Sequence, residues 1–120
     1  MNHLIDQIKN HPDYHDAGMI LCHEGIVRKT SRDGKTVTGL RVHVHHQKLQ
    51  ETLDFYKKRN GIIDILFEIN DKVDLNIGDT IMRLVVAGNI RENVISTLTD
   101  CLNTIKSTVT HKTEYYETNA

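Results

Sequence analysis

The last third of the chain carries three cationic side chains at points where secondary structure is expected to change. Arg91 follows an apolar run, Lys106 closes a helical pattern, and Lys112 lies in a β-rich tail. Scaffolds commonly place binding groups at the ends of strands and helices, so these cations are candidates to converge on one anionic ligand. Two of them also have a simpler explanation, because Arg91 beside Glu92 suits an exposed helix start and Lys106 suits the negative end of a helix dipole.

The histidines suggest the main alternative to an anion site, which is a metal site. His43 and His45 would share one face of a strand, a spacing that suits zinc or another divalent metal if His23 or a carboxylate came near. Structural zinc sites normally have four converging ligands, and the sequence shows no second cluster. We therefore expect an exposed polar face and no bound metal.

Composition limits the class of protein. The 120 residues carry a formal net charge of -1, which excludes a general attraction to nucleic acid or to an anionic membrane. The length fits one domain, residues 1–120, and no stretch approaches the ~20 apolar residues of a membrane-spanning helix. Cys22 and Cys101 lie far apart within apolar runs, and the N-terminus has no apolar export signal. These features indicate buried thiols in a cytoplasmic protein.

The first half of the chain predicts a helix, two strands and a second helix. The first helix ends before Pro12, since the residue ahead of a proline prefers extended backbone. A strand is expected over residues 17–30, a glycine-containing hairpin turn over 31–34 and a returning strand over 37–44. A second helical pattern runs over 49–61 and ends at a glycine.

The second half predicts two strands, a long helix and a last strand. The strands are expected at 62–69 and 81–86, the helix over 91–106 and the last strand over 108–116, with 117–120 frayed. The resulting order is α-β-β-α-β-β-α-β. It predicts an α+β fold in which helices pack on a mostly antiparallel sheet, similar to an α/β-hammerhead.

A set of short motifs runs through the chain in order. They are Ala17-Gly18-Met19-Ile20, Glu24-Gly25-Ile26-Val27-Arg28, Gly78-Asp79, Arg91, Lys106 and Lys112-Thr113-Glu114. Each motif is weak alone, so the specificity comes from their order and distances. On these motifs the chain resembles the large, catalytic subunit of molybdopterin synthase over nearly its whole length, and the family pattern fits without a gap from Gly78 to Lys106.

This resemblance implies sulfur transfer in molybdenum cofactor biosynthesis. In that family the large subunit forms a homodimer within a heterotetramer, and each half receives the C-terminal Gly-Gly tail of a small ubiquitin-like subunit carrying a thiocarboxylate. The implied substrate is cyclic pyranopterin monophosphate, which gains two sulfurs to form the dithiolene of molybdopterin. No cofactor of the subunit itself is expected.

The resemblance also assigns roles to single residues. Substrate binding is carried over to Ile26, Val27, Arg28, Ile90, Arg91, Lys106, Lys112, Thr113 and Glu114. Arg28 and Arg91 suit a phosphate, because a guanidinium donates two parallel hydrogen bonds. Lys106 is the expected central catalytic group, since a lysine whose charge is disfavoured acts as a base or nucleophile. Lys112 is expected to assist it, with Glu114 on the same side of a strand to orient the ammonium or accept a proton.

The sequence departs from the family at two places. Ile90 stands where the family usually has a histidine, and it has no polar group. Residues 107–111 form a segment one residue shorter than its family counterpart, without the usual proline and tryptophan. A second interpretation therefore stays open, a non-catalytic paralogue that keeps the dimeric scaffold and binds a ubiquitin-like tail or another partner.

Overall fold

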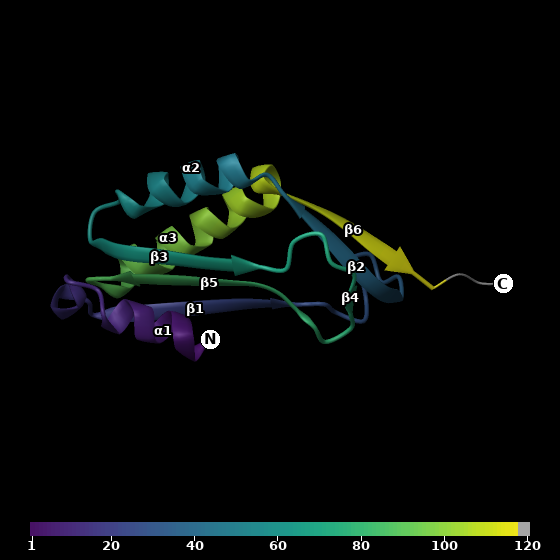
Figure 1. The fold of residues 1–120 in the computed structure, drawn as a ribbon, viewed down its shortest axis with the longest axis horizontal. Helices are drawn as coiled ribbons and strands as arrows, with labels where there is room; N and C mark the ends of the chain where they lie inside the picture. The colour runs from purple at the N-terminus through teal and green to yellow at the C-terminus, as the bar shows by residue number, and fades with distance from the viewer. Residues whose placement is uncertain (118–120) are drawn as a thin grey trace.

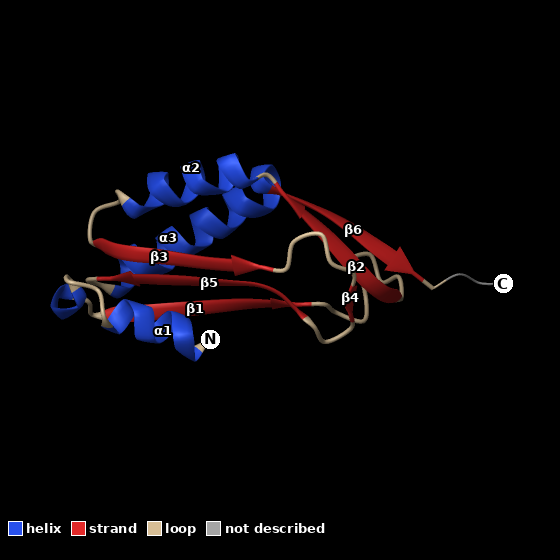
Figure 2. Ribbon diagram, in the orientation of Figure 1, coloured by secondary structure: helices blue, strands red, loops and turns tan. Residues whose placement is uncertain are grey.

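The computed structural model describes residues 1–117, which form two antiparallel sheets of three strands each (Figures 1 and 2). The strand orders are β1-β5-β3 and β4-β2-β6. The elements are α1 (Asn2–Lys9), the 3-10 turn η1 (Tyr14–Asp16), β1 (Met19–Ile26), β2 (Val37–Val44), α2 (His46–Lys57), β3 (Ile62–Ile69), β4 (Leu75–Asn76), β5 (Thr80–Gly88), α3 (Arg91–Thr104), the π-helical turn η2 (Ile105–Val109) and β6 (Thr110–Tyr116). The expected α+β class is confirmed.

Strand β5 is the centre of the first sheet and is buried on both faces. Leu84 and Val86 belong to the main core, together with residues of α2 and α3. Val85 and Ala87, on the other face, pack in a smaller cluster with Leu4 of α1. Figure 1 shows the same layers, with α2 and α3 on one face of the sheet and α1 on the other.

The second sheet extends the molecule at one end, so the overall dimensions are 58 × 25 × 23 Å. The predicted alternation along β2 is confirmed, because Leu40, Val42 and Val44 are all buried. In the antiparallel register, Val42 lies opposite Lys112 and Leu40 lies opposite Glu114. Directly opposed residues share a face, so these two charged residues of β6 lie on the same side as the apolar residues of β2.

The predicted hairpin between the first two strands is wrong. Strand β1 pairs with β5, whereas β2 pairs with β4 and β6 in the other sheet. A turn does form at residues 31–34, with Gly34 at φ +86, but the pairing beside it stays local: a bridge from Thr30 to Thr36 and a bond from the Val37 amide to the Lys29 carbonyl at 2.8 Å. Turn residues fix the local reversal of the chain and leave open which strands pair beyond it.

Several boundaries also differ from prediction. The third helix ends at Thr104 and passes into the π-helical turn η2, and the short strand β4 was not foreseen. Cys22 is exposed and not buried as expected, whereas Cys101 is buried. The predicted fraying falls partly on 118–120, which lie outside the described residues; the amide of Glu117 donates to the Thr36 carbonyl at 3.1 Å. Within residues 1–117 no helix has the length and apolar character needed to cross a bilayer.

Candidate active site

A cavity of about 530 Å³ lies where the two sheets meet. Its apolar walls come from both sheets and from η2, through buried residues that include Leu40, Val42, Met82 and Ile105. Its charged lining consists of four cations, Arg28, Arg32, Lys106 and Lys112, and one carboxylate, Glu114. An excess of positive charge against low-dielectric walls favours an anionic ligand.

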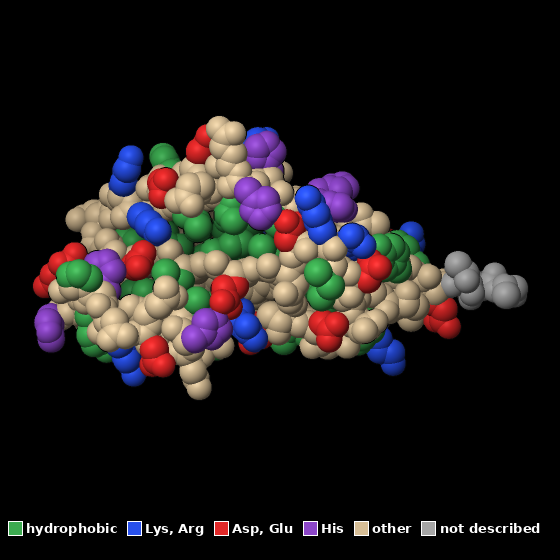
Figure 3. Space-filling model, viewed as in Figure 1, with side chains coloured by type: hydrophobic (Ala, Val, Ile, Leu, Met, Phe, Trp, Pro, Cys, Tyr) green, Lys and Arg blue, Asp and Glu red, His purple; other side chains and the backbone are tan. Residues whose placement is uncertain are grey.

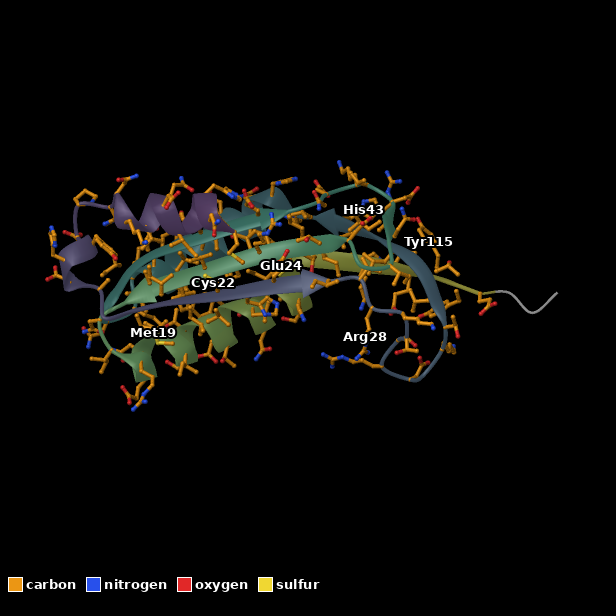
Figure 4. All side chains as sticks on the ribbon, turned by 90° about the horizontal axis from the view of Figure 1, so that it is seen from below. Met19, Cys22, Glu24, Arg28, His43 and Tyr115 are labelled. Carbon is orange, nitrogen blue, oxygen red and sulfur yellow. The ribbon has the colours of Figure 1, made fainter. Side chains whose placement is uncertain are left out.

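The position of Arg28 is set by a contact between two distant segments. The amide of Val27 donates to the Asp79 carbonyl at 2.9 Å, and the amide of Gly78 donates to the Val27 carbonyl at 2.9 Å. Gly78 has φ +88, a conformation that glycine adopts without strain. The fixed backbone leads directly to Arg28, whose Nε donates to the Thr30 carbonyl at 2.7 Å. Figure 4 shows Arg28 past the end of β1, on the segment that leads to the second sheet.

Lys106 is carried by the π-helical turn η2. Ile105 and Val109 anchor this turn in the core, with exposed fractions of 1% and 2%. The amide of Thr110 donates to the Ile105 carbonyl, and the Val109 carbonyl accepts from the amide of His45 at 2.8 Å. Lys106 projects between the two anchors and lines the cavity. Single π-helical turns occur frequently at functional sites.

The surroundings of Lys106 disfavour its charge. Lys106 is exposed as a residue, but partial burial of its ammonium beside the cavity wall lowers the pKa from its ordinary value, and the positive charges of Arg32 and Lys112 lower it further. A lower pKa raises the fraction of neutral amine at physiological pH. This is the property that a catalytic base or nucleophile requires.

Lys112 and Glu114 form an ion pair on the cavity side of β6. Lys112 Nζ lies 3.5 Å from Glu114 Oε1, and the carboxylate side chain is only 19% exposed. Thr113, between them, pairs in register with Arg41 and belongs to the opposite face of the sheet, outside the cavity. The pair places a carboxylate where it can hold the Lys112 ammonium toward a ligand.

Arg91 and Ile90 lie at the far end of α3 from Lys106. The 14 residues of this helix correspond to a length of roughly 20 Å. Arg91 Nε is 3.6 Å from Glu92 Oε1, and Ile90 is 52% exposed at the N-cap. The cavity of one chain thus brings together Ile26, Arg28, Lys106, Lys112 and Glu114, but not Val27, Ile90, Arg91 or Thr113.

The histidines of β2 and α2 have other surroundings. His45 caps α2, its Nδ1 accepting from the amide of Lys48 at 3.2 Å, and His46 Nε2 lies 2.8 Å from Asp71 Oδ2. His43 is exposed, and Figure 3 shows histidine and basic side chains gathered where α2 meets β2 and β6. Among residues 1–117, no three His, Cys, Asp or Glu side chains are grouped to hold a metal ion.

His23 is a cavity residue that motif reasoning did not assign to the site. It lies on β1 between Leu21, which packs on the main core, and Gly25, which also lines the cavity. Its Nε2 is buried without a hydrogen-bond partner among the described residues. Burial lowers the imidazole pKa, and the charge of Lys106 lowers it further. The available signal was a polar residue at a core-facing position of an alternating strand.

Comparisons with known proteins identify a family and a fold. A model of the MoaE protein family matches residues 2–108. No curated protein matches the chain. A molybdopterin synthase from Staphylococcus aureus superposes with a TM-score of 0.72 at 21% identity, covering 87% of this chain and 78% of that one.

Two further structures share the fold over nearly the whole chain. Molybdopterin cofactor biosynthesis protein E from Burkholderia multivorans gives a TM-score of 0.75 at 17% identity, covering 97% of this chain and 80% of that one. A complex of subunits 1 and 2 of molybdopterin-converting factor from Helicobacter pylori gives 0.70 at 17% identity, with coverages of 98% and 84%. At these identities the likeness supports the fold alone.

Proposed function

Because the chain belongs to the MoaE family, the large, catalytic subunit of molybdopterin synthase in molybdenum cofactor biosynthesis, we propose that the cavity between its two sheets holds cyclic pyranopterin monophosphate during sulfur transfer. The observation that carries this proposal is Lys106, a lysine of lowered pKa in a cationic cavity. A lowered pKa alone occurs at many structural sites. The lowered pKa of Lys106 together with the other cations that converge on the cavity supports a catalytic role for this residue.

We assign the substrate phosphate to the part of the cavity that Arg28 and Arg32 line. Arg28 is held by its Nε bond to Thr30, and Arg32 lines the same cavity from the turn that follows. Guanidinium groups remain charged at all physiological pH values and match the geometry of phosphate oxygens. Charge on the bound phosphate would offset the repulsion among the four cations.

Lys106 and Lys112 then divide the proton chemistry. Lys106, whose lowered pKa raises the fraction of neutral amine, acts as base or nucleophile at the reacting carbon of the substrate. Lys112 stays paired with Glu114 at 3.5 Å and supplies a fixed positive charge for a developing anion. Glu114 holds the ammonium in place and is available to accept a proton.

The sulfur donor is a partner chain in this proposal. The Helicobacter pylori structure contains a complex of the two subunits of molybdopterin-converting factor. For the present chain we assign the thiocarboxylated C-terminal Gly-Gly tail of a small ubiquitin-like subunit as donor. Its negative charge suits entry into the same cationic cavity.

In this proposal, a second copy of the chain supplies the cavity in which Arg91 binds substrate. Within one chain Arg91 is exposed and separated from Lys106 by the length of α3. If Arg91 binds substrate, it must do so in the cavity of another copy, which requires the homodimer. The proposed assembly is therefore a homodimer with one small subunit at each cavity.

Reconstitution tests the proposed function. The chain is mixed with a thiocarboxylated small subunit and cyclic pyranopterin monophosphate, and molybdopterin is measured as its fluorescent oxidation product. Formation of molybdopterin that depends on both chains is expected. Binding of the small subunit without any molybdopterin would instead favour the non-catalytic interaction module.

A further inference from the structure

The half-buried imidazole of His23 is a polar group that the proposed chemistry leaves unused. His23 lies on the face of β1 that carries Met19 and Leu21, both packed against the main core. Its Nε2 is hidden from water and has no hydrogen-bond partner in the described part of the chain. A buried nitrogen in that state loses the hydrogen bonds it makes to water in the unfolded chain, so its presence weakens the fold.

The space around this nitrogen belongs to the cavity. A Cβ atom at Gly25 would stand 3.9 Å from His23 Nε2 and 3.3 Å from Met82 Cγ, and all three residues line the cavity. The Met82 side chain therefore packs closely against Gly25, next to His23 Nε2, at the wall of the cavity. Because Nε2 has no accessible surface in the free protein, a ligand can reach it only if the side chain turns. Rotation of the ring by 180° about χ2 exchanges Nε2 with Cε1 in almost the same volume and leaves the backbone in place.

The charge balance of the cavity decides which part of a ligand belongs there. Arg28, Arg32, Lys106 and Lys112 are all exposed cations that line the cavity, whereas His23 is half-buried beside Met82, with Lys106 as the cation that acts on it. A neutral imidazole has one donor and one acceptor nitrogen and adds no further positive charge. It therefore suits an uncharged polar ring and not the phosphate.

We propose that His23 is a substrate-positioning residue, whose ring nitrogen hydrogen-bonds to the uncharged heterocyclic part of the phosphorylated substrate while the exposed cations hold the phosphate. This inference rests on the proposed function. The free protein has already removed water from the nitrogen, so a ligand hydrogen bond there requires little additional desolvation of the protein. The imidazole thereby adds selectivity for the ring over phosphate alone.

Three variants separate this role from a structural one. His23→Phe keeps a planar ring and removes both nitrogens, and His23→Gln restores a hydrogen-bonding nitrogen near the position of Nε2. The matched control is His43→Phe, at an exposed strand histidine outside the cavity. Binding of cyclic pyranopterin monophosphate is measured by calorimetry, and binding of inorganic phosphate is measured by NMR titration.

The expected result is a loss specific to the ring. His23→Phe should weaken binding of the precursor about tenfold, the effect of one net hydrogen bond. Inorganic phosphate should bind as it does to the parent chain, His23→Gln should recover most of the lost affinity, and His43→Phe should change neither ligand. The ligand-free His23→Phe chain should unfold at a temperature no lower than the parent, because the unpaired nitrogen is gone.

Other results contradict the inference in distinguishable ways. Unchanged precursor affinity in His23→Phe, an equal loss of phosphate affinity, or no recovery in His23→Gln would each overturn the role of His23 alone. A lower unfolding temperature in both His23→Phe and His23→Gln would show that the role of the residue is structural. A parent chain that binds no precursor would contradict both this inference and the proposed function.

Discussion

The hydroxyl of Tyr56 on α2 and the hydroxyl of Thr104, the last residue of α3, lie 2.7 Å apart. This contact fixes the end of α3 immediately before the turn that carries Lys106. Arg59 reinforces it, with its guanidinium 4.7 Å from the Tyr56 ring centroid and its Nη1 2.8 Å from Asp100 Oδ2. The position of the cavity lysine thus depends on packing between the two helices that cover the first sheet.

Tyr56→Phe should reduce both stability and catalysis. Loss of the hydroxyl pair should cost about 1 kcal/mol in the free energy of unfolding, the usual net value of one hydrogen bond. The turn carrying Lys106 should also be held less firmly, so molybdopterin formation should fall several-fold under conditions where the variant is fully folded. Chemical denaturation and the reconstituted assay measure the two effects. Tyr14→Phe, on the α1 side, is the control, and full activity in folded Tyr56→Phe would contradict the link to Lys106.

Lys106 should react selectively with an aldehyde that carries a phosphate. Pyridoxal phosphate forms an imine only with a neutral amine, and its phosphate suits the nearby arginines. Because the pKa of Lys106 is lowered, labelling should rise with pH through an apparent pKa below the ordinary value of 10.5. Borohydride trapping and peptide mass spectrometry identify the site.

The comparison for this labelling is Lys9, in the last turn of α1 and outside the cavity. Excess inorganic phosphate should protect Lys106 and leave Lys9 unaffected. Equal labelling of the two lysines at pH 7.5, without protection, would show that the cavity neither depresses the pKa nor binds phosphate.

The two cysteines should differ in reactivity. Cys22 is exposed, although partial burial also raises the pKa of its thiol, whereas deeper burial raises the pKa of Cys101 to about 11. The thiolate is the reactive form, so an aromatic disulfide reagent at pH 8 should modify one thiol rapidly and the second only after unfolding. Cys22→Ser should remove the rapid phase; a rapid phase that survives this change would place the exposed thiol elsewhere.

Local patterns predicted most elements but not their pairing. The alternation of Leu40, Val42 and Val44 gave β2 correctly, because only one face of that strand is buried. The turn at 31–34 suggested that β1 and β2 pair, yet both find partners far along the chain. Strand pairing depends on long-range burial, which short motifs do not encode.

The site shows the same division between local and long-range information. Lys112 and Glu114 were expected on one side of a strand and do form an ion pair, since side chains two residues apart share a face. Arg91 and Lys106 were expected to converge, but a helix that starts at one and ends beside the other holds them apart. His23 lines the cavity because of the orientation of β1 in the fold. No sequence motif indicated that orientation.

Mixed dimers should show whether Arg91 serves a neighbouring cavity. Arg91→Ala and Lys106→Ala chains are each expected to be inactive. After dissociation and mixing in equal amounts, about a quarter of the cavities should combine an intact Lys106 with an intact Arg91 from the partner copy and recover activity. No recovery, although mixed dimers are shown to form by mass spectrometry, would exclude a role for Arg91 across the dimer.

The most direct measurement concerns Lys106 itself. Molybdopterin formation is compared for the parent chain, Lys106→Ala and Lys9→Ala, each with the same thiocarboxylated small subunit and precursor. We predict that Lys106→Ala lowers the rate at least 100-fold, the range lost with a general acid or base, while Lys9→Ala, which removes an ordinary helix-end cation, keeps the parental rate. Parental turnover by a folded Lys106→Ala chain would contradict the assignment of this cavity as the site of sulfur transfer.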